Sequence, residues 1–176
     1  MCIRDSVKRV WDKYVESGEL EYRGAILWLK NHAKIHRGRS MGVGSVANKP
    51  FPRDSYEMIY IFRYGNERRI KHIPRLDRKF TLLMRQPWII QPDNERTKRG
   101  GFHMATFPVE LVTNMLYCFT VAGEVVLDPF MGSGTTLRGA MKMGRAGWGI
   151  ELNPEFAEYA IKKAELNKYS LARYIP

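Results

Sequence analysis

The chain of 176 residues has few cysteines, no long apolar run and no internal repeat, and each absence excludes a class of protein. Two cysteines are too few for a disulfide-stabilised secreted domain or a cysteine metal cluster. His32, His36 and His72 lack cysteine partners at a zinc spacing, so we expect no metal. No apolar stretch reaches the roughly 18 residues that cross a membrane, and the N-terminus lacks the apolar core of a secretion signal. These absences predict a cytosolic protein that does not enter a membrane.

Acidic residues are outnumbered. The 29 lysines and arginines against 18 aspartates and glutamates give a net charge of +11. Because cations that neutralise phosphates release condensed counterions, nucleic acid is the first class of partner to consider. Hydrophobic residues make up 44% and aromatic residues 12% of the chain, which argues against disorder. The composition therefore predicts a folded, basic domain.

The N-terminal half combines short regular elements with basic connections. Apolar residues in 7–15 recur with helical spacing, and the apolar runs 24–29 and 56–62 predict buried strands. The segments 31–55 and 67–86 are rich in lysine and arginine and have no clear period. Long basic connections in a compact domain are more often functional than decorative.

From Phe107 onward, helices and strands alternate. This order is typical of a parallel α/β sheet. The apolar side chains of Trp88 and Trp148 are expected to lie in the core. We expect a short strand at 88–90, helices at 108–119, 135–143 and 154–166, and strands at 124–127 and 146–150.

A glycine-rich turn at 127–136 joins a predicted strand to a predicted helix, where ligands bind in open α/β sheets. A phosphate-binding P-loop needs a lysine after the second glycine, but none follows Gly134. A dinucleotide site needs a third glycine where Leu137 stands. A site for S-adenosylmethionine and a plain acid-capped turn without a ligand are the other two interpretations.

Two acids favour S-adenosylmethionine. Asp128, at the end of one strand, can accept a hydrogen bond from the amino group of a methionine moiety. Glu151, at the end of the next strand, can accept from both ribose hydroxyls, as acids do in dinucleotide sites. The glycines between them let backbone approach a ligand closely. Both acids therefore point to one cofactor.

These residues also carry a family resemblance. Segment 128–136 resembles the D-P-F-x-G-S-G-T-T motif of amino-group DNA methyltransferases, which modify cytosine N4 or adenine N6. Segment 149–153 resembles the ribose-binding motif of that family, and 103–111 resembles its H-x-A-x-F-P-x-E-L block. The resemblance implies a Rossmann-like methyltransferase fold, S-adenosylmethionine as cofactor and double-stranded DNA as partner. The cofactor-binding residues it implies are Ala105, Thr106, Phe107, Asp128, Phe130, Gly132, Ser133, Gly134, Thr135, Glu151 and Leu152.

The order of the three motifs resembles a circularly permuted branch in which the catalytic half precedes the cofactor-binding half. The family catalytic motif, [DSN]-P-P-[YF], should then lie before the strand at 24–29, and it is absent. The Pro-Phe-Pro run at 50–52 follows that strand and lacks the polar first residue. No catalytic residue is therefore assigned, and we expect a permuted α/β fold that is incomplete at its N-terminus.

Residues 1–6 resemble a translated sequencing-library adapter rather than the start of a gene. The expected layout is then a non-native start at 1–6 and a partial methyltransferase domain at 7–176. Within this domain we expect a remnant of the catalytic half at 7–65, a target-recognition segment at 66–87 and the cofactor-binding half at 88–176.

DNA contacts are expected in the two basic segments, because a target base must be flipped out of a clamped duplex. The candidates are Arg37, Arg39 and Ser40 in the first segment and Arg68 and Arg69 in the second. Two other functions stay open. In the first, the chain is a catalytically silent nucleic-acid-binding protein that keeps the fold. In the second, the methyl acceptor is RNA or protein, because pocket motifs report the cofactor and not the acceptor.

Overall fold

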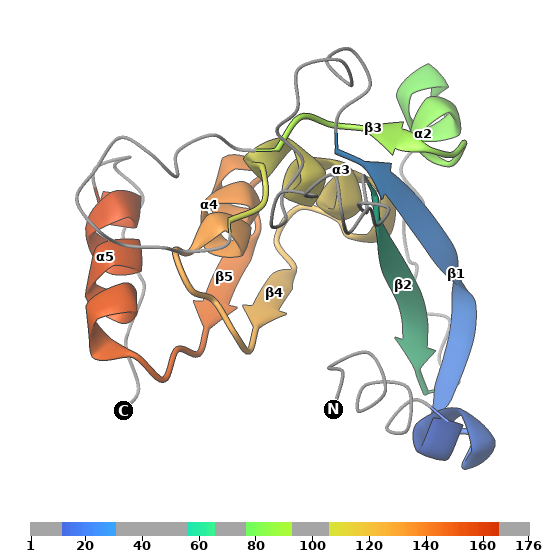
Figure 1. The fold of residues 1–176 in the computed structure, drawn as a ribbon, viewed down its shortest axis with the longest axis horizontal. Helices are drawn as coiled ribbons and strands as arrows, with labels where there is room; N and C mark the ends of the chain where they lie inside the picture. The colour runs from blue at the N-terminus through green and yellow to red at the C-terminus, as the bar shows by residue number, and fades with distance from the viewer. Residues whose placement is uncertain (1–11, 31–55, 66–76, 93–105, 166–176) are drawn as a thin grey trace, which may run out of the picture. The chain divides into compact units, whose positions relative to one another are not determined.

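The computed structural model describes residues 12–30, 56–65, 77–92 and 106–165 (Figure 1). The chain divides into two compact units. One comprises residues 1–73 and 86–89, and the other comprises 74–85 and 90–176.

The first unit is built on a three-stranded sheet in the order β2-β1-β3. Strand β1 (Leu20–Leu29) pairs antiparallel with β2 (Tyr56–Tyr64) and parallel with the short β3 (Trp88–Ile89). The side chain of Gln86 prolongs the second pairing, because its Oε1 accepts from the backbone N–H of Leu27 at 2.7 Å and its Nε2 donates to the carbonyl of Ala25. The strands expected at 24–29, 56–62 and 88–90 are confirmed.

Only one face of the β1–β2 ribbon is buried, because side chains alternate along a strand. Ile26 and Trp28 of β1 lie in the core with Trp88 of β3. The opposite face carries a row of exposed tyrosines and a methionine: Tyr22, Tyr56, Met58, Tyr60 and Tyr64. Residues 24–29 are buried or half-buried as expected, but the expectation of a buried strand at 56–62 was wrong, since apolar and aromatic composition does not distinguish a covered face from an exposed one.

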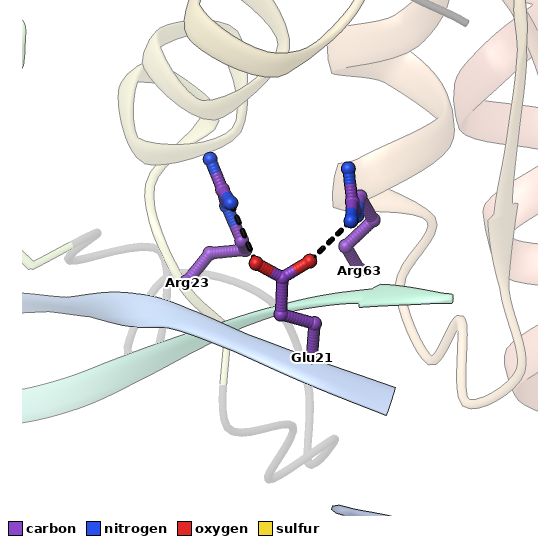
Figure 2. A network of polar contacts seen from close by, with 3 residues as sticks. All are labelled: Glu21, Arg23 and Arg63. Carbon is purple, nitrogen blue, oxygen red and sulfur yellow. Dashed lines mark hydrogen bonds and ion pairs between the residues drawn. The ribbon is translucent and has the colours of Figure 1, made fainter. Parts of the chain in front are cut away.

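A charged network ties the ends of β1 and β2 together (Figure 2). Glu21 stands opposite Arg63 in the register, and its carboxylate pairs with both Arg63 and Arg23, the latter at 2.7 Å. The hydrogen bond from Arg23, with the positive charges of both arginines, lowers the pKa of Glu21. A β-bulge follows at Arg23, where Gly24 adopts a φ of +132° that other residues rarely reach.

The second unit is an α/β unit whose two strands are parallel. Strand β4 (Val125–Asp128) pairs with β5 (Ala146–Gly149) over four residues each. Four helices complete the described part of this unit: α2 (Arg78–Leu83), α3 (Val109–Phe119), α4 (Thr135–Lys142) and α5 (Pro154–Glu165). The expected alternation of helix and strand is confirmed, whereas α2 lies in a segment where no regular element was expected.

Glycines let α4 pack closely against its neighbours. A Cβ on Gly139 would lie 2.5 Å from Cγ1 of Val112 on α3, and a Cβ on Gly147 of β5 would lie 3.0 Å from Leu137. Leu137 joins Met131 and two alanines of α5 in one buried cluster. Helix α4 is therefore held by α3, β5 and α5 at once.

Arg145 locks the C-terminal ends of α3 and α4. Its guanidinium donates to the carbonyl and hydroxyl of Thr120, at 2.7 and 3.0 Å, and to the carbonyls of Leu116 and Met143. The last carbonyls of a helix lack partners within the helix, so a cation there satisfies them and opposes the negative end of the helix dipole.

The face of β4 and β5 that points away from α4 is apolar and exposed. It carries Val125, Leu127, Trp148 and Ile150, and we call it the open face. Trp148 is 67% exposed, so its expected place in the core was wrong, while Trp88 is 4% exposed as expected. Within the described ranges, no helix has both the length and the hydropathy needed to cross a membrane.

Candidate functional site

The glycine-rich turn follows β4 directly and is tied to the end of β5. The carboxylate of Asp128 accepts from the backbone N–H of Phe130 at 3.0 Å, so it shapes the start of the turn. The backbone carbonyl of Asp128 accepts from the N–H of Ile150 at 2.9 Å, and the carbonyl of Ile150 accepts from the N–H of Met131 at 3.0 Å. These bonds continue the β4–β5 pairing beyond the strands. The turn therefore has a defined place at the carboxyl edge of the sheet.

Two residues of the turn adopt left-handed backbone conformations, with φ of +48° at Gly132 and +72° at Gly134. The N–H of Gly134 donates to the carbonyl of Met131 at 2.8 Å and closes the turn. A Cβ on Gly134 would also lie 2.9 Å from Cβ of Ala160 on α5. Glycine is required at position 134 on both counts, conformation and space.

Glu151 is bonded to this turn. Its Oε2 accepts from the N–H of Gly132, and its Oε1 accepts from the N–H of Asn153, both at 2.9 Å. Asn153 in turn accepts from the N–H of Glu155 and begins α5. The acids expected to act together, Asp128 and Glu151, thus bracket one loop, each half-buried and fixed by backbone donors.

The side chains of Ser133 and Thr135 are buried, and their hydroxyls bond each other at 3.1 Å. Nη2 of Arg138 donates to Oγ1 of Thr135 at 3.2 Å, while Nε of Arg138 is buried with no hydrogen-bond partner in the structure. These hydroxyls support the loop from within, and ligand contacts from Ser133 and Thr135 are expected from their backbone. Arg138 carried no sequence signal that distinguishes it from a surface arginine.

Exposed apolar side chains accompany the two acids. Phe130 beside Asp128 is 88% exposed, and Leu152 beside Glu151 is 96% exposed. Thr106 is half-buried and Phe107 is exposed where the chain enters α3. Large apolar side chains held in water next to fixed carboxylates offer surface to the flat, apolar part of a ligand.

The site thus presents two hydrogen-bond-accepting carboxylates, backbone N–H groups and apolar surface. Helix α4 begins at Thr135, and the residue at its N-cap, Gly134, has no side chain that could accept from the N–H groups of the first turn. Such a set can hold a ligand that combines an amino group, neighbouring hydroxyls and an aromatic ring. Across the described ranges, no group of three histidine, cysteine or acidic side chains gathers to hold a metal.

The expected residues of the basic segments, Arg37, Arg39, Ser40, Arg68 and Arg69, lie outside the described residues, as does Ala105. Their contacts with DNA or cofactor stay predictions.

Comparison with known proteins gives concordant results. The model of the N6/N4 methyltransferase family, described as DNA methylase, matches residues 3–162. The type II methyltransferase M.MjaI of Methanocaldococcus jannaschii is 30% identical over 139 residues, which cover 73% of this chain and 44% of M.MjaI. M.Cfr9I of Citrobacter freundii, also a type II methyltransferase, is 43% identical over 66 residues, or 38% of this chain and 22% of M.Cfr9I.

Among solved structures, TTHA0409 of Thermus thermophilus, in complex with S-adenosyl-L-methionine, aligns with a TM-score of 0.66 at 23% identity. The alignment covers 97% of this chain and 64% of TTHA0409, and it shows a shared α/β fold. The chain therefore spans less than two thirds of the length of each of these relatives.

Proposed function

Because the chain belongs to the N6/N4 family of DNA methylases, we propose that it binds S-adenosylmethionine at the β4–α4 turn and contributes this site to methylation of double-stranded DNA. The observation that carries the proposal is the pair of hydrogen bonds from the N–H groups of Gly132 and Asn153 to Glu151. These bonds hold the Glu151 carboxylate, an acceptor suited to ribose hydroxyls, against the glycine turn. The bound cofactor found in TTHA0409 supports the same assignment.

Each side chain of the site has a role that fits its contacts. Asp128 uses one carboxylate oxygen to accept from Phe130, and the other is suited to the amino group of the methionine moiety. Glu151 has lone pairs beyond those that accept backbone N–H groups, and these suit the ribose hydroxyls. Phe130 and Leu152 offer apolar surface to the adenine ring. S-adenosylmethionine supplies the methyl group when bound.

The proposed acceptor is an exocyclic amino group, cytosine N4 or adenine N6. Transfer of this kind is a direct displacement in which the nitrogen attacks the methyl carbon, so alignment of the two reactants provides most of the catalysis. The family motif that holds the amino group, [DSN]-P-P-[YF], does not occur in the sequence. We therefore expect the chain to bind cofactor without transferring methyl groups by itself.

Calorimetric titration of the purified chain with S-adenosylmethionine tests the proposal. We expect saturable binding that Asp128→Ala weakens, while Glu158→Ala, which removes an exposed carboxylate of α5, leaves it unchanged. A folded chain that shows no saturable binding would overturn the proposal.

A second candidate function is a catalytically silent nucleic-acid-binding protein that keeps the fold. The absent catalytic motif and the net charge of +11 favour it. A chain extended to include a [DSN]-P-P-[YF] motif discriminates between the two. Transfer of labelled methyl groups to duplex DNA supports the enzyme, and inactivity of the folded, motif-containing chain supports the silent protein. Duplex RNA in a parallel reaction tests the remaining acceptor class.

A further inference from the structure

Arg138 of α4 is a cation without an anionic partner in the described part of the chain. Its side chain is half-buried, and its Nη2 donates to Oγ1 of Thr135, one turn earlier in the helix, at 3.2 Å. Nε of Arg138 is buried and meets no acceptor of the described residues. No acidic side chain of those residues forms an ion pair with Arg138 either. Because a charge withdrawn from water is unfavourable until it is paired, this guanidinium would stabilise an anion bound close to it.

The bond to Thr135 begins a short chain of hydrogen bonds. A guanidinium only donates, so Oγ1 of Thr135 accepts from Arg138. The hydroxyls of Thr135 and Ser133 share one further bond at 3.1 Å, and both side chains are buried. In a cooperative chain each hydroxyl accepts one bond and donates the next, so Thr135 donates to Ser133. The proton of the Ser133 hydroxyl then has no acceptor among the described residues.

This spare proton belongs to the glycine turn. Ser133 stands between Gly132, whose N–H bonds to Glu151, and Gly134, the N-cap of α4. The roles proposed above give partners to the amino group, the ribose and the adenine ring of S-adenosylmethionine. They leave the carboxylate of its methionine moiety without one. A hydroxyl donor backed by a cation suits this carboxylate, because hydrogen bonds to ionised acceptors are the stronger ones.

We propose that Arg138 is a positioning residue for the carboxylate of S-adenosylmethionine: through Thr135 it orients the Ser133 hydroxyl to donate to that carboxylate, and its charge compensates the negative charge. The inference rests on the proposed function, which places this cofactor at the turn, and goes beyond it. None of the residues that the family resemblance implies for the cofactor is a cation. The arrangement predicts that the site prefers ligands with a carboxylate to the same ligands without one.

Decarboxylated S-adenosylmethionine tests this preference, because it lacks only the carboxylate and keeps the amino group, the sulfonium, the ribose and the adenine ring. In calorimetric titrations we expect the unaltered chain to bind S-adenosylmethionine about tenfold more tightly than the decarboxylated compound, the effect of one hydrogen bond to a charged group. Equal affinities for the two compounds would overturn the inference.

Arg138→Met keeps the apolar stem of the side chain and removes the guanidinium. We expect it to weaken binding of S-adenosylmethionine about tenfold without weakening binding of the decarboxylated compound, so that the preference disappears. Lys142→Met, one turn further along α4 on its exposed side, is the matched control for loss of a cation. The control is needed because the decarboxylated compound carries more positive charge, which a chain of net charge +11 disfavours wherever its cations lie. Loss of the preference in Lys142→Met to the same extent would overturn the role of Arg138.

The hydroxyl step is tested with Ser133→Ala, which removes the end of the chain that faces away from Arg138. It should reduce the preference as Arg138→Met does, and the double variant should lose less than the product of the two single losses, because both residues act on one bond. Arg138→Lys, which retains a charge and a donor, should keep part of the preference. If Arg138 only held the turn in shape, Arg138→Met would weaken binding of both compounds equally, and that result would overturn the inference.

The outcomes separate this inference from the proposed function. Binding of both compounds with equal affinity overturns the inference and leaves cofactor binding at the turn standing. A folded chain that binds neither compound overturns the proposed function and the inference with it. Circular dichroism and Tm report whether each variant is folded. Where Arg138→Met does not fold, Arg138→Lys and the comparison of the two compounds on the unaltered chain decide.

Discussion

Replacement of Glu151 by glutamine changes one oxygen of the side chain to an amino group and leaves its size unchanged. In the structure both carboxylate oxygens accept a backbone N–H at 2.9 Å, one from Gly132 in the turn and one from Asn153 before α5. An amide has one acceptor oxygen, so in either orientation its NH₂ group faces one of these N–H donors. Glu151→Gln must therefore break one of the two bonds and remove the charge from the other.

The size of the effect follows from these contacts. A hydrogen bond to a charged group contributes roughly 1.5–3 kcal/mol, and Glu151 is half-buried, so water compensates part of the loss. The ribose hydroxyls lose the same charged acceptor in the proposed complex. Because about 1.4 kcal/mol corresponds to a factor of ten, we expect the Kd for S-adenosylmethionine to rise about tenfold to a hundredfold.

Calorimetric titration with S-adenosylmethionine measures this change, and circular dichroism confirms that the variant is folded. Glu151→Ala, which removes both acceptors, should weaken binding further than Glu151→Gln does. Glu158→Gln on the exposed side of α5 is the matched control for loss of charge. If folded Glu151→Gln bound the cofactor as tightly as the control, the assignment of Glu151 to the ribose would be refuted.

Three more predictions concern backbone conformation, helix ends and pH. Gly134→Ala should cost about 2–4 kcal/mol of unfolding free energy in urea and abolish cofactor binding, because it adds a steric conflict with α5 to left-handed strain; Gly144→Ala, with a similar φ of +73° and its nearest contact at 4.0 Å, should cost only about 1 kcal/mol. Arg145→Ala should cost about 2–4 kcal/mol in the same assay, because several helix-end carbonyls lose their donor, and a loss below that of Lys142→Ala would contradict this role. The hydrogen bond from Tyr117 to Asp77 lowers the pKa of Asp77 and raises the pKa of Tyr117. The stability that this bond gives to α2 is therefore present above the ordinary aspartate pKa of 3.8 and is lost as pH falls below that value. The same stability is present below the ordinary tyrosine pKa of 10.0 and is lost as pH rises above that value. Amide signals of α2 in NMR titrations should follow both limits, and Tyr117→Phe should remove the alkaline one; an unaltered alkaline limit in that variant would show that another group titrates.

The elements from Val109 to Glu165 could be predicted from the sequence, because local signals mark their ends. Gly144 stops α4 in a left-handed conformation, and Pro154 opens α5, as their residue types predict. The placement of Asp128 and Glu151 at the same edge of the sheet, after neighbouring strands, followed from a general rule, that neighbouring parallel strands end at the same edge of a sheet. The structure adds the backbone bonds that hold them there.

Other features depend on contacts that no local pattern encodes. Helix α2 has no apolar stripe, and its stability comes from a tyrosine 40 residues away in the chain. An aspartate before a run of helix-forming residues was the one signal for it. Trp148 was misplaced because both faces of a parallel strand are usually covered, so an apolar residue gives no information about which face is open. Nothing in the sequence around Arg145 distinguishes it from a surface cation, because its partners at the ends of α3 and α4 meet it only in the folded chain.

The open face of β4 and β5 has a consequence for the life of this chain in a cell. Val125, Leu127, Trp148 and Ile150 are each more than half exposed, and exposed apolar side chains are what chaperones bind and what leads to aggregation. Quality control responds to such exposure even where the rest of the fold is stable. We expect the abundance of the chain to rise with whatever shields those four side chains, and Trp148→Lys to lengthen its half-life in cells.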